Sequence, residues 1–311
     1  MKGADKEMIA TILKVLGAIT LVLTALVGCQ TIRNSGQEPL PAPIDGTLRI
    51  ATYNVHYIIL GRDTGDWSVG DWERRKTPLD LAFKAVGADV IGFQEMESFA
   101  RGSNGRVNLT LDWLLANNPS YAAAAVGDPS IFPSTQPIFY RRDRLTVLDQ
   151  GWFFFSDTPD VIYSRTFNGS FPAFTSWAQF RDNANGEVFR VINLHTDYAS
   201  RSNRIQSIEL VAERIAPWIG DNETLFVIGD FNGRIGDTVI DILVDEGLDF
   251  APVKGSTFHF NRGINLFGAI DHIASAGNAQ LANPPVVLRQ KFADEWPTDH
   301  YPVVADYRLG D

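Results

Sequence analysis

The sequence predicts one mixed α/β (α+β) domain that begins near residue 47 and follows a leader and a linker. Short apolar runs rich in β-branched and aromatic residues, such as 225–228, have the composition of strands buried on both faces. Segments with apolar residues on one helical face, such as 201–218, alternate with these runs. No internal repeat or second linker interrupts the rest of the 311 residues, so we expect a single domain over residues 47–311.

The individual elements follow from the same two periodicities. Thr77 as the cap, Pro78 in the first turn and Gly87 as the stop predict a helix over 77–87. The aromatic block 152–155 is interpreted as sheet core in preference to a wedge that touches a membrane. Further helices are expected at 109–117, 201–218 and 239–244. Strands are expected at 47–55, 89–95, 121–126, 137–140, 145–155, 175–180, 188–194, 225–228, 256–260, 269–273 and 303–307.

The first 28 residues predict a lipoprotein signal peptide. Lysines precede an apolar run over 15–27 that is short for a membrane span. The run ends in Leu26-Val27-Gly28-Cys29, which resembles a bacterial lipoprotein processing site, where cleavage precedes the cysteine and the sulfur is acylated. Cys29 is the only cysteine, so no internal disulfide can form. A plain signal peptide, or an anchor helix with an incidental cysteine, is the alternative.

Residues 29–46 predict a lipidated N-terminus followed by a flexible tether. The segment is rich in proline and small polar residues and has no apolar periodicity. Acyl chains on Cys29 would hold the protein on a membrane surface without a spanning helix. Gln30 after the cysteine resembles the sorting preference of outer-membrane lipoproteins. We therefore expect a lipid-anchored protein of the bacterial cell envelope, at the outer membrane in preference to the inner one.

The charge balance argues against a long polyanion as the main partner. The chain carries 27 basic and 37 acidic residues, a net charge of −10, and its densest basic runs are 74–76 and 141–142. Such a surface repels polyanions at long range unless a local basic patch intervenes. We expect a monomer with a small or lipid-linked substrate, and nucleic acid is a possible but disfavoured partner.

Polar residues follow the expected strands where each strand ends. Asp230 and Asn232 come directly after the apolar run 225–228 and Gly229, and side chains two apart on a strand point the same way. An acid beside an amide suits holding and deprotonating a water, although a simple turn is the alternative because Gly, Asp and Asn are also turn residues.

The same arrangement recurs along the chain. Charged groups gathered on one rim would repel each other without a cation or ligand. Oxygen donors without a thiolate favour a hard ion, Mg²⁺ first and Mn²⁺ second. The residues concerned are Asn54, Glu95, His195, Asp197, Asp230, Asn232, Asp271, Asp299 and His300.

Six short motifs make the chain resemble the endonuclease/exonuclease/phosphatase superfamily over residues 47–309. Each motif alone has little specificity, but their order along the chain is highly specific. They are Thr52-Tyr53-Asn54, Gln94-Glu95, Asn193-Leu194-His195-Thr196-Asp197, Gly229-Asp230-Phe231-Asn232, Ile270-Asp271-His272-Ile273 and Thr298-Asp299-His300. The resemblance implies a four-layer α/β/β/α sandwich, in which two central β-sheets pack face to face and the site lies at one rim.

The resemblance also implies which residues bind the metal and which act on the water. Asn54, Glu95 and Asp299 would hold the metal. Asp230 would orient or deprotonate the attacking water with the help of Asn232.

Further roles concern the phosphoryl group and the rest of the substrate. His195 and His300 would contact the phosphoryl oxygens, Asp299 would fix the tautomer of His300, and Asp271 would support the metal or His300. One departure is the run 172–177, which lacks an Arg that many bacterial relatives carry there, and Arg165 and Arg204 are the candidates to substitute for it. The substrate-binding residues would be Tyr140, Asp197 and Arg204.

Three functions compete on this sequence. The leading hypothesis is an exported, membrane-anchored, Mg²⁺-dependent phosphoesterase that hydrolyses a phosphate mono- or diester by in-line attack of water. The second is a surface endonuclease or exonuclease acting on DNA or RNA with the same chemistry. The third is a lipoprotein that binds a phosphorylated ligand without turnover, and it ranks last because no reactive group is missing.

Overall fold

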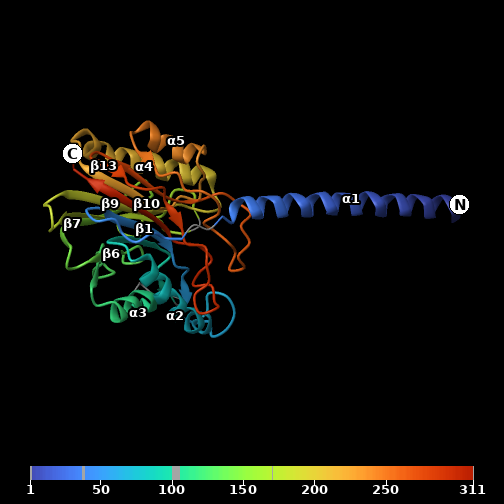
Figure 1. Ribbon diagram of the computed structural model, residues 1–311, viewed down its shortest axis with the longest axis horizontal. Coiled ribbons are helices and arrows are strands. Elements are labelled where there is room, and N and C mark those ends of the chain that lie inside the picture. Colours follow the sequence, from blue (N-terminus) through green and yellow to red (C-terminus); the bar gives the residue numbers. More distant parts are fainter. Residues whose placement is uncertain (1, 37–38, 100–105, 170, 311) are drawn as a thin grey trace.

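The computed structural model describes residues 2–36, 39–99, 106–169 and 171–310 (Figure 1). Two β-sheets pack face to face, helices cover the outer face of each sheet, and one long helix projects from the domain. The domain therefore has the four α/β/β/α layers that the sequence resemblance implies.

The seven-stranded sheet has β1 (Leu48–Asn54) near its centre, between antiparallel β15 (Val303–Leu309) and parallel β3 (Val90–Gln94). The register places Asn54 opposite Gln94 and Thr52 opposite Val303, so the last residues of β1 and β3 lie at one rim. The other strands of this sheet are β5 (Tyr121–Ala124), β6 (Ile138–Arg141), β13 (Ala279–Leu281) and β14 (Val286–Val287).

The six-stranded sheet is organised around β10 (Thr224–Asp230), the stretch with the strongest buried-strand composition. Its neighbours are parallel β9 (Val188–His195) and antiparallel β12 (Asp271–Ala276), and the register places Asp230 opposite both His195 and Asp271. The remaining strands are β7 (Leu145–Phe154), β8 (Phe174–Asp182) and β11 (Asp249–Phe250). A separate parallel pair consists of β2 (Ile58–Ile59) and β4 (Ser98–Phe99).

Three apolar clusters hold the layers together. One fills the space between the sheets and includes Ile50, Val90 and Phe226. The aromatic block 152–155 is core, because Phe153 and Phe155 pack in the cluster between the six-stranded sheet and its helices. The helices are α2 (Val69–Val86) and α3 (Leu109–Asn117) on the first sheet, and α4 (Arg201–Gly220) and α5 (Thr238–Asp245) on the second.

Helix α2 begins earlier than the sequence predicts. Its cap is Ser68, whose side chain accepts a hydrogen bond from the Asp71 backbone N–H, and not Thr77. Pro78 lies inside the helix, where the burial of Trp72 and Leu79 against the sheet outweighs the hydrogen bond that proline lacks. The predicted stop is confirmed, since Gly87 adopts a left-handed conformation and donates to the Phe83 carbonyl.

The strand predicted at 256–260 is wrong. Only an isolated bridge between Phe258 and His300 forms there, because Phe260 and Asn261 have positive φ values of 59° and 54°, which a strand cannot contain. The segment instead forms a loop beside His300, and the next strand begins at Asp271.

The N-terminal segment is one helix, α1 (Lys2–Asn34), which extends into the expected tether. Residues Glu7–Asn34 are long and apolar enough to cross a membrane, although a signal sequence near an N-terminus meets the same criterion. The end of the helix and the chain after it contact the domain: Asn34 donates to the Leu266 carbonyl at 3.2 Å, and Leu40 packs against the core. The described residues of 29–46 therefore make specific contacts with the domain.

Candidate active site

The two sheets bring the polar strand ends to one rim. His195, Asp230 and Asp271 are lateral neighbours in the six-stranded sheet, where strand pairing fixes their spacing. Asn54 ends β1 of the facing sheet, and Glu95 follows β3 in a left-handed conformation with φ 54°. The rim therefore gathers residues from both sheets although they are far apart in the sequence.

Asp230 lies at the centre of this group. Its Oδ2 atom accepts a hydrogen bond from Asn54 Nδ2 at 3.2 Å, and lies 3.7 Å from His195 Nε2 and 3.7 Å from His300 Nε2. Burial and the nearby Asp271 charge raise the pKa of Asp230, while His300 and His195 oppose that change. The result is a buried carboxylate of increased basicity between two imidazoles.

Asn232 is fixed beside Asp230 by hydrogen bonds that the protein makes to itself. Its backbone N–H donates to Asp230 Oδ1 at 2.9 Å, and its Nδ2 donates to the Thr196 carbonyl at 2.9 Å. The preceding Gly229 has φ 148°, and a Cβ there would collide with the Leu194 carbonyl oxygen. The Gly-Asp-Phe-Asn motif thus allows the strand ends of β9 and β10 to approach closely.

Asp271 holds His300. The sequence resemblance had left open whether Asp271 supports the metal or this histidine. Asp271 Oδ2 and His300 Nδ1 are 2.9 Å apart, so His300 Nε2 faces Asp230. Burial alone would lower the pKa of His300, but the charges of Asp271, Asp230 and Asp299 outweigh it and raise this pKa well above its usual value.

The sequence resemblance implied that Asp299 fixes the tautomer of His300, but in the structure Asp299 has another partner. Its Oδ1 atom pairs with His56 Nδ1 at 3.1 Å instead, because Asp299 points towards β1 while His300 points towards β12. Burial by itself would raise the pKa of Asp299, but the His56 hydrogen bond and the charges of His56 and His300 lower it strongly.

The site fits a hard divalent cation. The Asn54 amide lies between two carboxylates, 3.1 Å from Glu95 Oε1 and 3.2 Å from Asp230 Oδ2. Asp271 Oδ1 is buried with no hydrogen-bond partner in the described part of the chain. Oxygen donors with surplus negative charge match the preference of Mg²⁺ and Mn²⁺.

Two groups of residues could hold that cation. Asp230, Asp271 and His300 offer ligand atoms within 4.8 Å of one another, but all three are buried and Asp271 already pairs with His300. Glu95 and Asp299 are 24% and 20% exposed, which leaves their side of the rim open to a hydrated ion. The buried trio and the more exposed pair of Glu95 and Asp299 are therefore both candidate positions for the cation.

The structure does not bring Tyr140 to this rim. Tyr140 lies opposite Val90, four residues before Gln94, and its ring packs against Phe180 in the core between the sheets. Because β6 runs antiparallel to β3, each residue towards Tyr140 is about 3.3 Å farther from the site. The substrate-binding role predicted for Tyr140 is therefore wrong.

Asp197 and Arg204 shape a loop next to the site. Asp197 Oδ1 accepts hydrogen bonds from the backbone N–H groups of Ala199 and Ser200, at 2.8 Å and 2.7 Å. Arg204 Nη1 donates to the carbonyls of Asp197 and Tyr198 at 2.9 Å and 3.0 Å. These contacts hold the turn that leads from β9 into α4, with Asp197 in the loop after His195 and Arg204 in the first turn of the helix.

Some residues of the site were not singled out from the sequence. His56 directly follows the first expected strand, and its pairing with Asp299 depends on a contact across 243 positions. Asn193 bridges the sheets: it accepts from Gln94 Nε2 at 2.6 Å and donates to the Phe93 carbonyl at 2.8 Å. Both Gln94 and Asn193 belong to recognised motifs, and that was the only available signal.

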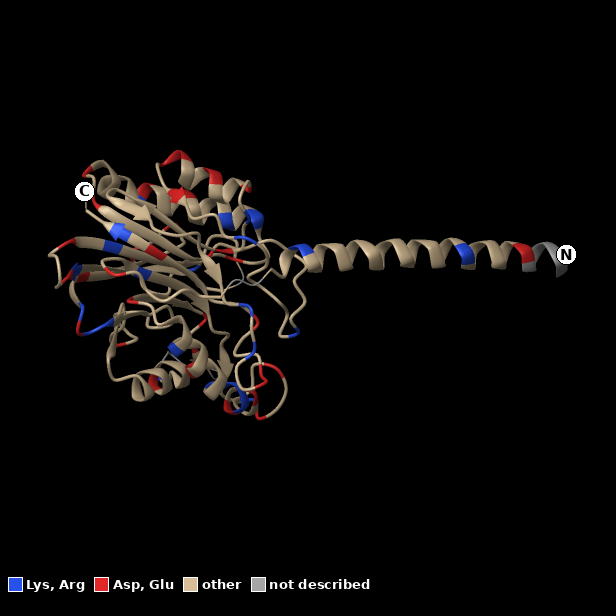
Figure 2. Ribbon diagram, viewed as in Figure 1, with Lys and Arg blue, Asp and Glu red and all other residues tan. Residues whose placement is uncertain are grey.

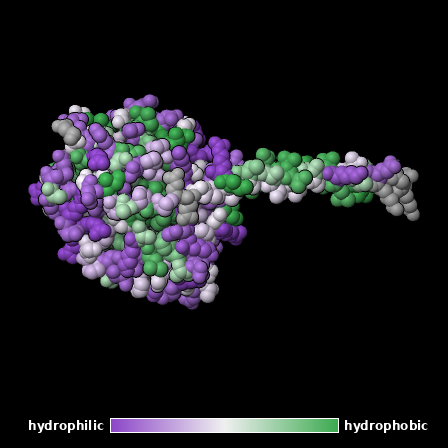
Figure 3. Space-filling view, viewed as in Figure 1, coloured by the Kyte–Doolittle hydropathy of each residue, from purple (hydrophilic) through white to green (hydrophobic). Residues whose placement is uncertain are grey.

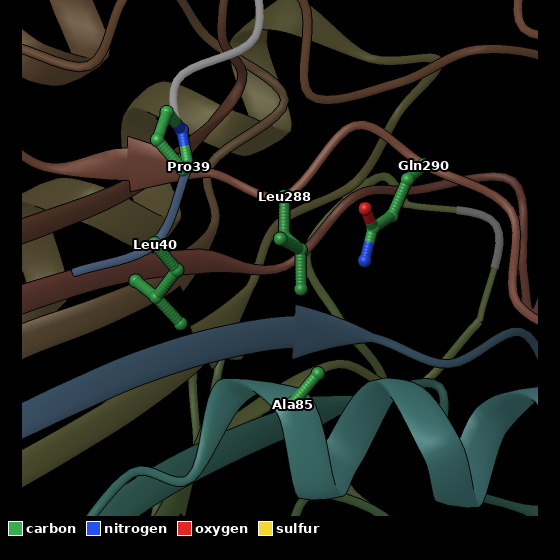
Figure 4. Close-up of a pocket in the computed structure, with 5 residues that line it drawn as sticks. All are labelled: Pro39, Leu40, Ala85, Leu288 and Gln290. Carbon is green, nitrogen blue, oxygen red and sulfur yellow. The ribbon is translucent and has the colours of Figure 1, made fainter. Parts of the chain in front are cut away.

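A cavity without this chemistry lies elsewhere, between α2 and the segment after α1 (Figure 4). Its volume is about 520 Å³ and its lining is Pro39, Leu40, Ala85, Leu288 and Gln290. These side chains include no acid and no histidine, so this cavity has none of the chemistry of the rim.

Many solved structures share the fold of this chain. An endonuclease/exonuclease/phosphatase family protein from Bacteroides thetaiotaomicron is 24% identical, with a TM-score of 0.73, over 87% of this chain and all of that one. A mannosyl-6-phosphatase from the same organism is 25% identical, with a TM-score of 0.71, over 84% of this chain and 99% of that one. D. rerio TDP2, solved with a single-strand DNA product, is 15% identical over 85% of this chain and 99% of that one, with a TM-score of 0.62.

The sequence comparison agrees with the fold. No curated protein sequence matches the chain. The model of the "Endonuclease/Exonuclease/phosphatase family" matches residues 51–300, which include all six motifs and the whole rim. The chain therefore belongs to the endonuclease/exonuclease/phosphatase family and is a metal-dependent hydrolase of phosphoester bonds.

Proposed function

We propose that the protein is an exported, membrane-anchored, Mg²⁺-dependent phosphoesterase that hydrolyses a small or lipid-linked phosphate mono- or diester. The observation that carries the proposal is the position of Asp230 between the Nε2 atoms of His195 and His300, 3.7 Å from each. A carboxylate beside two imidazoles can accept a proton from water while the imidazoles face the phosphoryl oxygens.

The residues of the rim divide the work of hydrolysis. Asp230, whose pKa is raised by burial, accepts a proton from the attacking water, and Asn232 helps to hold that water. The water oxygen bonds to phosphorus as the ester P–O bond breaks. His300, kept protonated by Asp271, and His195 stabilise the charge on the phosphoryl oxygens.

Asn54, Glu95 and Asp299 are the residues that would hold the cation. When bound, Mg²⁺ supplies positive charge for the phosphoryl oxygens, and Mn²⁺ could replace it. The partial exposure of Glu95 and Asp299 supports this choice.

The anchor is proposed at Cys29. Its side chain is exposed, and the apolar helix before it has no buried window. Acylation of Cys29 after removal of residues 1–28 would place the protein in the bacterial cell envelope, at the outer membrane in preference to the inner one. Mass spectrometry of the mature N-terminus tests this proposal, because an unmodified peptide that begins elsewhere would exclude it.

The test of activity is a substrate panel on the full-length protein, with Mg²⁺ and with a chelator. The panel contains nucleotides, sugar phosphates, inositol phosphates, phospholipid headgroup esters and plasmid DNA. We expect the best turnover on a small or lipid-linked ester, and activity that a chelator abolishes. Turnover on plasmid alone, or turnover that persists with the chelator, would contradict the proposal.

A nuclease is the second candidate, and one observation favours it. Phe171 is exposed with its ring 6.2 Å from the His195 ring, and Tyr198 is exposed on the loop after it. Bases of a single strand can stack on such rings. A steep fall in plasmid or single-strand cleavage with rising salt would promote this function, since contact with six to ten phosphates costs about 10³–10⁵ in affinity between 50 and 200 mM salt.

A further inference from the structure

Two loops next to the end of α1 expose large apolar side chains. We call residues 234–236 and 260–268 the anchor-side loops. Ile235 is 57% exposed and Phe267 is 47% exposed, and Phe260 and Ile264 are exposed as well. Single exposed apolar residues are ordinary, but four of them on two adjoining loops form an apolar patch of the kind that marks an interaction surface.

Hydrogen bonds fix the end of α1 to these loops. The buried Asn34 donates through Nδ2 to the Leu266 carbonyl at 3.2 Å, and its own carbonyl accepts from the Ser256 N–H at 3.0 Å. Asn265 Nδ2 donates to Ser35 Oγ at 2.8 Å, and Arg289 donates to the Gly36 carbonyl. The direction in which the helix leaves the domain is therefore set by contacts.

The junction is also basic. A cavity of about 420 Å³ lies between the helix and the loops, and its lining includes Gln30, Arg33, Arg234, Ile235 and Phe267. Figure 2 shows Lys and Arg around the base of α1, and Figure 3 shows the apolar rod of the helix meeting a surface of mixed polarity. Asp237 lies 3.9 Å from the exposed Arg234 and offsets part of that charge. Basic and apolar side chains together suit the boundary between anionic headgroups and acyl chains.

We propose that the anchor-side loops contact the same bilayer that holds the N-terminal anchor, and that the partner of this surface is a membrane with anionic headgroups. Cys29 precedes Asn34 by five helical residues, a rise of about 7.5 Å. A bilayer that holds either α1 itself or acyl chains on Cys29 must therefore lie next to the loops. Ile235 and Phe267 enter the interface, and Arg33 and Arg234 meet the headgroups.

This surface leads directly to the active site. The Phe267 ring lies 6.1 Å from Phe260, Phe260 lies 4.4 Å from Phe258, and Phe258 lies 5.0 Å from the His300 ring. A membrane on the loops would thus lie only a few rings from the catalytic rim. This inference rests on the proposed function. The substrate is then a phosphoester in the headgroup of a lipid, and the active site reaches it while the lipid stays in the bilayer.

The experiment places one fluorescent label on the full-length chain. Three proteins are made in a Cys29→Ser background, so that each carries a single cysteine. The substitutions are Phe267→Cys, Ile235→Cys and the control Val188→Cys, and α1 remains as the anchor in all three. Val188 is 41% exposed at the far end of the strand that ends in His195. Each protein is reconstituted into vesicles of phosphatidylcholine and phosphatidylglycerol that carry a nitroxide on the upper acyl chain.

We expect several-fold stronger quenching at positions 235 and 267 than at 188, and weaker quenching when phosphatidylglycerol is omitted. Equal quenching at all three positions, or none at 235 and 267 in vesicles that retain the protein, would overturn the inference. Circular dichroism checks that each labelled variant is folded, and the two loop positions check each other.

A second measurement separates this inference from the proposed function. The double variant Ile235→Ser/Phe267→Ser is compared with the parent on a soluble phosphoester and on a lipid phosphoester in vesicles. We expect a several-fold loss on the lipid substrate alone. If the double variant turned over both substrates at the rate of the parent, the membrane contact would be overturned and the phosphoesterase function would stand. Quenching at the loops without turnover of any phosphoester would overturn the proposed function instead.

Discussion

The two ends of the sandwich both bury charged residues, but only one end balances them. At the end away from the site, Arg49 forms two hydrogen bonds with Asp306, at 2.7 Å and 2.9 Å. Arg144 joins Asp89 at 2.7 Å and Asp182 at 2.8 Å. Each of these three acids is paired with an arginine, so this end contributes to stability.

The site end is deficient in positive charge. Glu95, Asp230, Asp271 and Asp299 lie at the rim, and within the part of the chain that the structure describes no Lys or Arg forms an ion pair with any of them. Among the described residues, histidines are the basic groups that pair with them directly, and the buried Arg75 acts on Asp299 only through its charge at longer range. The difference teaches that buried charge at the far end is matched for folding, whereas the site keeps surplus negative charge for a cation.

The largest expected effect is on catalysis at the site end. Asp230→Asn keeps the size of the side chain but removes the base and the charge near His195 and His300. We expect turnover to fall by about 10²–10³ or more, with an unfolding transition close to that of the parent. Steady-state kinetics on the best ester, together with thermal unfolding, checks this prediction. Near-parental turnover in a folded variant would show that Asp230 is not the base.

The opposite pattern is expected at the far end. Asp306→Asn leaves Arg49, which is 3% exposed, without its ionic partner. We expect a loss of about 3–5 kcal/mol in the free energy of unfolding, because the guanidinium stays buried. Turnover per folded molecule should not change. Urea denaturation and kinetics on the same sample would decide, and a variant with parental stability would remove the contrast between the two ends.

Metal binding should stabilise the site end specifically. Addition of Mg²⁺ at about 100 times its dissociation constant should raise the free energy of unfolding by about 2.7 kcal/mol. Glu95→Gln should weaken this stabilisation and raise the Mg²⁺ concentration needed for turnover, while Asp306→Asn should respond to Mg²⁺ as the parent does. Thermal unfolding across an Mg²⁺ titration measures both, and equal responses in all three proteins would place the cation elsewhere.

The smallest expected effect concerns pH. The pKa of His300 is raised above its usual 6.5, mainly by Asp271, so protonation of His300 stabilises the folded state. This contribution is fully present below pH 6.5 and is lost as the pH rises through the raised pKa of the folded protein. Without metal, the stability advantage of the parent over His300→Gln should therefore shrink with rising pH. An advantage that grows instead would mean that His300 is neutral in the fold.

Much of the site was determined by the sequence because its residues lie at strand ends. The apolar run of β10 fixes a buried strand, and the residues that follow it must emerge at a rim, as Asp230 and Asn232 do. The same reasoning placed Asn54, Glu95 and His195 correctly at that rim. The ends of α3 were also predicted, because its apolar residues lie close together in the sequence.

Only the tertiary structure decided which of these residues pair. Asp271 and not Asp299 holds His300, because strand pairing puts β12 beside β10 and leaves Asp299 to His56. Tyr140 packs against the core away from the rim, because the register of β6 against β3 sets its distance from the site. Both the partner of each reactive group and the distance of a residue from the rim depend on strand order and register, which no local pattern encodes. The sequence alone therefore determined the set of reactive groups, and packing of the two sheets decided the geometry in which they act.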